Sequence, residues 1–133
     1  MSIGVAAGVI ATALYTRLNV ASVTAHAGVY EEPAENLAFP YVLVGEAIES
    51  KDNRLGGKVG RELIFQIEIW TDERTFDKIH TIAGEIDELL DNYITFAPTG
   101  YTTQSLDFEE LQLVKVGLLR QGIARYRWTG IET

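Results

Sequence analysis

Residues 61–92 limit what this chain can fold into more than any other stretch, because they read first as a strand and then as a helix. In residues 61–71 the apolar side chains at positions 63, 65, 67 and 69 alternate with mostly polar neighbours, as in a strand with one apolar face. In residues 75–91 apolar side chains recur at three- and four-residue steps, which places them on one stripe of a helix. A short polar link joins the two segments, so we expect the helix to pack on the sheet.

The remaining pattern predicts an α+β fold. It is an α/β sandwich, in which a mostly antiparallel sheet of about four strands carries an N-terminal helix and the long amphipathic helix. We expect helices over residues 3–18 and about 75–91, the second capped by Thr71 or Thr75, and strands over about 40–48, 61–71, 111–119 and 122–131. The last two strands form a predicted hairpin that turns at Arg120-Gln121-Gly122, with the glycine at a position of positive φ. Residues 101–106 and Val29-Tyr30 are further candidate extended segments. The length of 133 residues predicts a single domain, 1–133.

Residues 49–60 are polar and glycine-rich, and they are too many for a tight hairpin. We expect a mobile arm that joins two antiparallel strands. It is either a plain loop or a loop that becomes ordered on a partner, since long loops on a rigid scaffold often carry contacts.

Composition excludes several functional classes. The chain has no cysteine, so disulfides, zinc–thiolate sites and thiol catalysis are ruled out. Its formal net charge of -8 argues against a nucleic-acid footprint and against docking on an anionic membrane. Residues 3–15 are apolar, but the run is too short to span a bilayer and lacks the basic residues of a secretory signal. We interpret it as a docked helix, with a signal peptide as the alternative.

Much of the negative charge falls on the predicted long helix. Residues 72–91 contain seven acidic side chains against Arg74 and Lys78, a formal charge of -5. Acids near the carboxyl end of a helix oppose its dipole. The simple interpretation is solubility, and the sharper one is a face that meets a basic partner or lines a channel for anions. The candidate residues of that face are Asp77, Glu85, Asp87, Glu88 and Asp91.

The sequence contains no catalytic motif. His26 and His80 lack the spacing of metal ligands, and neither a nucleophile elbow nor a phosphate-binding loop is present. Asp87 and Asp91 share a helix face, so a small magnesium-dependent hydrolase is a minor alternative. We therefore expect no enzyme activity and no cofactor.

Several features indicate assembly. A sheet of two hairpins has two edges, and closed oligomers often use them. The candidate interface residues are apolar side chains without an obvious place in a small core, together with polar residues of the arm: Trp70, Leu118, Leu119, Lys51, Asp52, Asn53, Arg54 and Lys58. Arg125 and Arg127 share a strand face, where they either form a basic spot or pair with carboxylates such as Glu62 or Glu68.

The order of these features resembles a known family. A helix that ends near Leu18 is followed by Val29-Tyr30 with a proline soon after, Phe39-Pro40-Tyr41-Val42-Leu43-Val44-Gly45 and a polar loop. Then come Phe65-Gln66-Ile67-Glu68-Ile69-Trp70-Thr71, a helix with Ile82-Ala83-Gly84-Glu85-Ile86, and a late strand with Arg125-Tyr126-Arg127. The pattern covers nearly the whole chain and is similar to the tail-completion, or tail-terminator, proteins of long-tailed bacteriophages and related phage-like particles.

The resemblance implies a structural virion protein that is made in the bacterial cytoplasm and sits at the head-proximal end of the tail. It implies a ring, typically of six subunits, on the last ring of the tail tube, where it stops tube growth and meets the head-closure or connector protein. DNA would pass through the lumen without sequence-specific binding, and no membrane is involved. The family offers no catalytic residues. The alternative is another neck or tail protein of such a particle, such as a head-closure or tail-tube protein.

Overall fold

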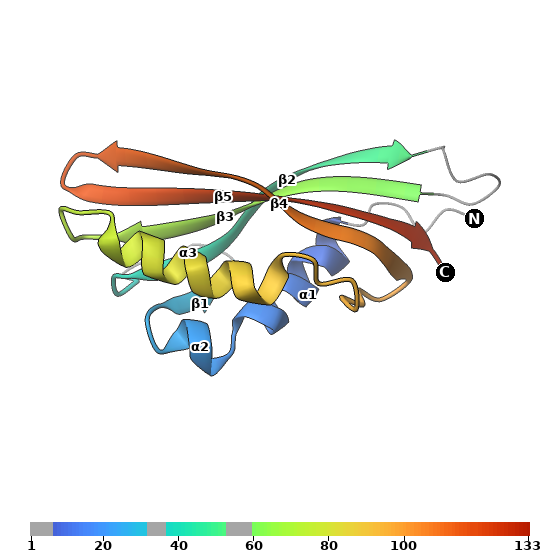
Figure 1. Ribbon diagram of the computed structural model, residues 1–133, viewed down its shortest axis with the longest axis horizontal. Helices are drawn as coiled ribbons and strands as arrows, with labels where there is room; N and C mark the ends of the chain where they lie inside the picture. Colours follow the sequence, from blue (N-terminus) through green and yellow to red (C-terminus); the bar gives the residue numbers. More distant parts are fainter. Residues whose placement is uncertain (1–6, 32–36, 53–59) are drawn as a thin grey trace.

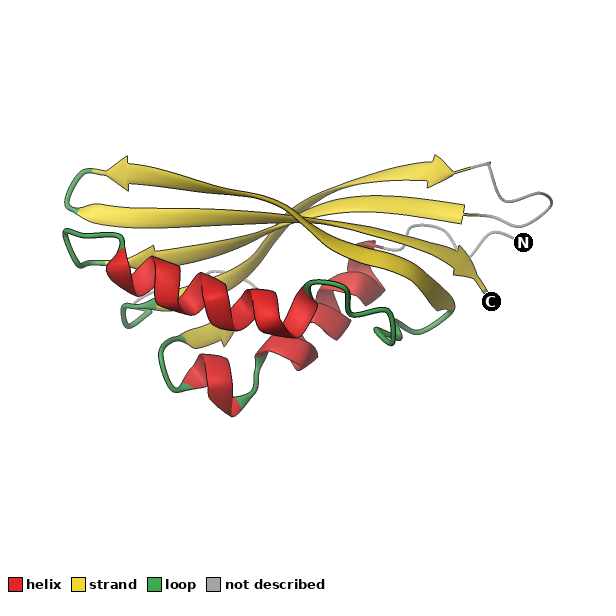
Figure 2. Ribbon diagram, in the orientation of Figure 1, coloured by secondary structure: helices red, strands yellow, loops and turns green. Residues whose placement is uncertain are grey.

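A computed structural model describes residues 7–31, 37–52 and 60–133. Its helices are α1 (Ala7–Leu18), α2 (Ala21–Thr24) and α3 (Asp77–Leu90). Its strands are β1 (Gly28–Tyr30), β2 (Tyr41–Asp52), β3 (Gly60–Thr71), β4 (Tyr101–Val116) and β5 (Leu119–Glu132). The strands form one twisted sheet in the order β1-β2-β3-β5-β4, and all three helices lie on the same side of it (Figures 1 and 2). The predicted α+β class is confirmed.

The core lies between the sheet and the helices. On β3 and β5 every second side chain is buried, which is the alternation expected for a sheet with one covered face. The buried side chains of these two strands meet an apolar stripe on α3 and a shorter one on α1. The largest members are Trp128, Tyr126, Phe65, Ile10, Leu14, Leu18, Leu63, Ile67, Ile69, Ile79, Ile82 and Ile86.

The sheet has five strands and not the predicted four. The extra strand is β1, which has three residues and pairs parallel with the start of β2, Val29 lying opposite Val42. A three-residue strand has no room for a periodic signal, so the sequence indicated only a possible extended piece at Val29-Tyr30. The other three strand pairs are antiparallel.

The predicted boundaries of the last hairpin are wrong. Residues 101–106 and 111–116 belong to one strand, β4, which is bent by irregularities between Thr103 and Ser105 and between Phe108 and Glu110, and Leu119 is the first residue of β5. The turn lies at Gly117 and Leu118, and Gly117 has a φ of +60°. Gly122, which we expected in the turn, is buried inside β5, where a Cβ would lie 2.5 Å from Ile79 Cγ2 of α3. A glycine selected for close packing was therefore mistaken for one selected for positive φ.

Part of the predicted arm is regular strand. The β2–β3 ladder continues through the pairs Glu49–Leu63, Ser50–Glu62, Lys51–Arg61 and Asp52–Gly60. Residues 53–59 of the arm, and residues 3–6 of the predicted first helix, lie outside the described residues.

Neither predicted threonine caps α3. Phe76 occupies the N-cap position without a side-chain hydrogen bond, and the Thr71 hydroxyl instead accepts the N–H of Glu73 at 3.2 Å. At the other end, the last turn of α3 contains no basic residue. Arg17 of α1 provides the cation there: its Nε donates to the Leu89 carbonyl at 3.0 Å, and its guanidinium lies 3.8 Å from the centroid of the Tyr93 ring. This contact from another helix offsets part of the unfavourable charge of the acids near that end.

Candidate assembly surfaces

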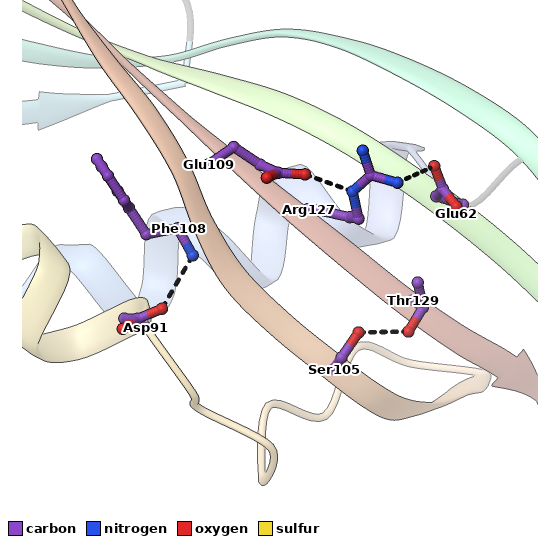
Figure 3. A network of polar contacts seen from close by, with 7 residues as sticks. All are labelled: Glu62, Asp91, Ser105, Phe108, Glu109, Arg127 and Thr129. Atoms are coloured by element: carbon purple, nitrogen blue, oxygen red, sulfur yellow. Dashed lines mark hydrogen bonds and ion pairs between the residues drawn. The ribbon is translucent and has the colours of Figure 1, made fainter.

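The sheet face opposite the helices, here called the open face, carries a row of polar side chains across β3, β5 and β4. Arg127 lies between Glu62 of β3, at 2.8 Å from Nη1 to Oε1, and Glu109 of β4 (Figure 3). Arg125 pairs with Glu110 at 2.7 Å, and on the same face Gln121 donates to Glu68 at 2.7 Å. The two arginines thus pair with carboxylates instead of forming a basic spot, and the predicted Arg127–Glu62 contact is present. The charged side chains in this row of the open face therefore neutralise one another.

The outer edge of β4 is covered over its first half. Residues 91–96, which follow α3, run along it: Asn92 N–H donates to the Leu106 carbonyl at 2.8 Å, and Asp91 Oδ1 accepts the N–H of Phe108 at 2.9 Å (Figure 3). The Thr103 hydroxyl donates to the Phe96 carbonyl at 2.6 Å. The bonds from Asn92 and Asp91 occupy the Leu106 carbonyl and the Phe108 N–H, which are β4 backbone groups that another strand could otherwise bind.

The second half of β4 has no such cover among the described residues. Beyond Phe108, β4 pairs with β5 alone. Its apolar side chains remain partly exposed, with Leu113 at 38% and Val116 at 40% of their full area, and Leu118 at the hairpin tip is 72% exposed. An uncovered strand edge beside exposed apolar groups is the usual appearance of a surface that becomes buried on assembly.

The predicted acidic face is divided in the structure. Asp87 accepts the buried Tyr126 hydroxyl at 3.0 Å, and Asp91 binds the β4 backbone as described above. Asp77 and Glu88 are exposed, and Glu85 is half-buried. Burial raises the pKa of the Tyr126 hydroxyl far above its ordinary value of 10.0, and the charge of Asp87 raises it further. Two of the five acids therefore have structural partners.

Metal chemistry finds no support in the geometry. Within residues 7–31, 37–52 and 60–133, no three histidine, aspartate or glutamate side chains are placed to hold a metal ion. Asp87 and Asp91 are directed at different groups of the sheet, Tyr126 and Phe108.

The predicted interface residues within the described part of the chain lie at the two ends of the sheet, with Trp70, Leu118 and Leu119 at one end and Lys51 and Asp52 at the other. Trp70 is half-buried at the β2 edge of β3 and stacks on Tyr41 with ring centroids 6.5 Å apart. Leu118 and Leu119 lie at the β4–β5 hairpin tip, where Leu119 is half-buried. Lys51 and Asp52 end β2, and Asn53, Arg54 and Lys58 lie outside the described residues. The structure thus places Trp70 beside the hairpin tip, because Trp70 pairs with Gln121 and so lies diagonally opposite Leu119 on the open face.

One further surface was not predicted from the sequence. It is a groove of 840 Å³ between α1 and the segment that follows α3. Val9, Ala13 and Val20 line one side, and Tyr93, Phe96 and Ala97 line the other. The signal that marks it in retrospect is the run of small side chains along the outer face of α1, at Gly8, Thr12, Ala13 and Thr16.

The sequence from residue 9 to residue 129 matches the model of a protein family described as tail completion protein gp17. The chain belongs to this family. As a tail-completion protein it is a structural component of a virion tail. The predicted resemblance is confirmed.

The fold of this tail-completion protein has also been seen in an assembled particle. A chain of the solved structure described as "Virion of native gene transfer agent (GTA) particle" superposes with a TM-score of 0.86 at 22% identity, covering 99% of this chain and 100% of that chain. At this identity the likeness concerns the fold. No curated protein sequence matches the chain. In the described part of the chain, no helix is long and apolar enough to cross a membrane.

Proposed function

We propose that this tail-completion protein, acting as one domain, forms a closed ring of six copies on the last ring of the tail tube. The ring stops tube polymerisation, presents its other surface to the head-closure or connector protein, and leaves a lumen for DNA. It works without a cofactor and without catalysis. Family membership over residues 9–129 supports the tail location, and the likeness to a chain of a virion supports a fold suited to such particles.

The observation that carries the proposal is the uncovered end of the β4–β5 hairpin. Leu118 exposes 72% of its area and Val116 exposes 40%, beside a strand edge that residues 91–96 do not reach. Closed rings need two different complementary surfaces on each copy, so that each copy binds the next in the same way. A sheet that ends in two different edges supplies them.

Charge is consistent with a passage for DNA. The chain has a net charge of -8, and the exposed Asp77 and Glu88 lie on α3. A lumen lined by negative charge repels the phosphate backbone and so avoids holding it. In the ring, Asp77, Glu85 and Glu88 are the lumen or partner candidates, because Asp87 and Asp91 already have partners within the chain.

The experiment combines solution mass with binding to tail tubes. Light scattering over a range of concentrations is expected to give a species near six times the 14.7 kDa chain mass, alone or after purified tail tubes are added. Electron microscopy is then expected to find the protein at one end of each tube. Leu118→Ser is the informative variant, since it removes an exposed apolar group without touching the core, and it should lower end-binding. His80→Gln, at an exposed position of α3 outside the candidate residues, is the control.

Two results would redirect the function. Decoration along the whole tube, or copolymerisation with the tube protein, would assign the chain as a tube component. Binding to isolated head connectors with no affinity for tubes would assign it as a head-closure protein.

A further inference from the structure

The sheet has a second uncovered edge, on β2, and it lies diagonally opposite the one on β4. β1 pairs only with Tyr41–Leu43 of β2, so residues 46–52 have no strand on that side among the described residues. We call residues 46–52 the β2 free edge and residues 110–116 the β4 free edge. Each copy thus carries two free edges on one continuous sheet.

The strand register shows that the two free edges lie at opposite ends of the sheet. Leu113 of the β4 free edge pairs with Gly122, Gly122 with Ile69, and Ile69 with Val42, which is where β1 covers β2. In the other half, Ile48 of the β2 free edge pairs with Ile64, Ile64 with Arg127, and Arg127 with Asp107, which is where residues 91–96 cover β4. In Figure 1 the β4–β5 hairpin tip and the end of β2 accordingly stand at opposite ends of the sheet. In each of these two rows of paired residues, the strand edge at one end is covered and the strand edge at the other end is free.

The strand directions allow the two edges to join. β2 runs antiparallel to β3, β3 to β5, and β5 to β4, so β4 runs opposite to β2. If the sheet of one copy continues into the sheet of the next in the same orientation, β4 meets the next β2 antiparallel, which is the stronger kind of pairing. The short β1 of that next copy occupies only the first part of its β2, so β1 and the incoming β4 lie end to end along the same edge.

The side chains on the two edges also match. Ile48 is 72% exposed on the open face of β2. Val114 lies opposite Gln121, whose side chain bonds Glu68 on the open face, so Val114 belongs to the open face as well. Antiparallel pairing of residues 110–116 with 46–52 places Ile48 directly opposite Val114 and next to Val116, which is 40% exposed. Cross-strand pairs of β-branched residues stabilise a sheet. The charged residues of the β4 free edge are Lys115 and Glu110, and Glu110 pairs with Arg125 within the same copy.

From these features we infer that the β4 free edge of one copy pairs antiparallel with the β2 free edge of the next copy, joining the sheets of neighbouring subunits into one. This inference rests on the proposed ring and names the contact that closes it. The partner is a second copy of this chain, and the bonds are backbone hydrogen bonds flanked by Ile48, Val114 and Val116.

The geometry of the contact suits a closed ring. Within one copy, Leu113 at the centre of the β4 free edge lies in the same row of paired residues as Val42 of β2. In the proposed contact Leu113 pairs with Glu49 of the next copy, seven positions further along β2, and this stretch includes the irregularity between Val44 and Ala47. Because the irregularity takes up one position, Val42 and Glu49 are level with Ile69 and Leu63, which are six residues apart on β3. At roughly 3.3 Å per residue the next copy is displaced about 20 Å along the strands, and four strands at about 4.8 Å displace it about 19 Å across them. The strands then tilt by roughly 45° from the ring axis, close to the tilt of closed β-barrels. Equal stagger at every contact is what allows the sheet to close on itself.

The first test is cysteine cross-linking, which the absence of native cysteine makes clean. The variant Ile48→Cys/Val114→Cys is mixed with purified tail tubes, oxidised and separated without reducing agent. Within one copy the two cysteines lie at opposite ends of the sheet, so any disulfide joins two copies. A ladder from dimer to hexamer is expected. The control Ile48→Cys/Thr102→Cys, with the second cysteine on the covered half of β4, should give no ladder.

A second variant removes a backbone donor instead of a side chain. Phe108 directs its N–H away from β5, toward Asp91, and pairs with Tyr126. By the alternation of an antiparallel ladder, the residues opposite Ala124 and Gly122, which are Leu111 and Leu113, also direct their N–H groups outward. Leu113→Pro removes one of these donors and spares the β5 ladder. It should stay folded by circular dichroism while self-association weakens at least tenfold.

The outcomes separate the edge contact from the ring. Intact rings without a ladder, or rings formed by Leu113→Pro as readily as by the unaltered chain, overturn the edge contact and leave the ring standing. A dimer cross-linked by Val114→Cys alone means that two β4 edges meet each other, and it also overturns the inference. No self-association with or without tubes overturns both the ring and the edge contact.

Discussion

The Tyr126 hydroxyl donates a hydrogen bond to Asp87 Oδ1 across 3.0 Å, linking the middle of β5 to the last turns of α3. The ring of Tyr126 is 1% exposed and stacks on Phe65, so the hydroxyl is the one polar atom of a buried aromatic side chain. Tyr126→Phe removes the bond and leaves the packing. Because a hydrogen bond to a charged acceptor contributes about 1.5–3 kcal/mol, we expect the free energy of unfolding in urea to fall by about 2 kcal/mol. Asp87→Asn keeps an acceptor and should cost less; an equal loss in both variants would contradict this account.

The same contact predicts a loss of stability at alkaline pH. Burial raises the pKa of Tyr126 above its ordinary value of 10.0, with Asp87 adding to the effect, and burial also raises the pKa values of Tyr41 and Tyr101. A group whose pKa is higher in the folded state contributes stability that is complete below pH 10 and declines as the pH rises above it. We expect the free energy of unfolding to be level from pH 8 to pH 10 and to fall beyond it. In Tyr126→Phe the free energy of unfolding should fall less steeply above pH 10. If it falls equally steeply in the variant and in the unaltered chain, Tyr126 is not the cause of the decline.

Arg17 joins α1 to the carboxyl end of α3, and its removal should loosen both. Arg17→Met keeps the apolar stem but loses the hydrogen bond to the Leu89 carbonyl and the contact with the Tyr93 ring. A charge-assisted bond contributes about 1.5–3 kcal/mol and an exposed cation–π contact about 0.5–1 kcal/mol, so we expect a loss of about 2 kcal/mol in urea unfolding. Arg17→Lys retains the charge near the helix end and should recover part of the loss. Unchanged stability in Arg17→Met would mean that the α3 carbonyls are satisfied equally well by water.

Gly122 should resist substitution for a reason that differs from the one its sequence context indicates. An alanine Cβ there would meet Ile79 Cγ2 at 2.5 Å, so either the Ile79 side chain or α3 itself has to shift. Overpacking of this kind costs about 1–3 kcal/mol, so Gly122→Ala should lower the free energy of unfolding by that amount. The matched variant is Gly117→Asn at the hairpin turn, where a φ of +60° suits asparagine, and it should cost little. If Gly117→Asn lowered the free energy of unfolding more than Gly122→Ala, the turn would instead lie at residues 120–122.

Gly122 also shows where prediction from sequence ended. β3 and α3 were predicted from their apolar periodicity, because both elements are long enough for the pattern to repeat. That prediction also implied the apolar layer between them, which includes Ile69 of β3 and Ile79 of α3. The turn of the last hairpin has no such repeat. We predicted the turn at Gly122, but the close packing of Gly122 against α3 places it inside β5, and Gly117 lies in the turn. β1 was too short to predict as a strand for the same reason.

The surfaces were harder to predict than the core. The alternation of β5 placed Arg125 and Arg127 on one face and made pairing with Glu62 an expected contact, since cross-strand partners follow from the register. The cover of β4 by residues 91–96 rests on single hydrogen bonds from Asp91 and Asn92, which leave no pattern in the sequence. For Leu118 the sequence indicated only an apolar side chain with no clear place in the core, and its exposure depends on where the turn falls.

The ion pairs of the open face should contribute little to stability. The Arg127 side chain is 43% exposed and that of Glu62 is 25% exposed, so water and salt screen their attraction. Exposed pairs contribute about 0.2–1 kcal/mol, and we expect a double-mutant cycle of Arg127→Met and Glu62→Gln to give a coupling free energy within that range, smaller still at high salt. The cycle is measured by urea unfolding at low and high ionic strength. A coupling as large as the expected Tyr126–Asp87 contribution would indicate that the pair is buried in solution, as it would be if another molecule covered the open face. Repeating the cycle under conditions where the protein remains monomeric distinguishes that case, because the excess coupling would then disappear.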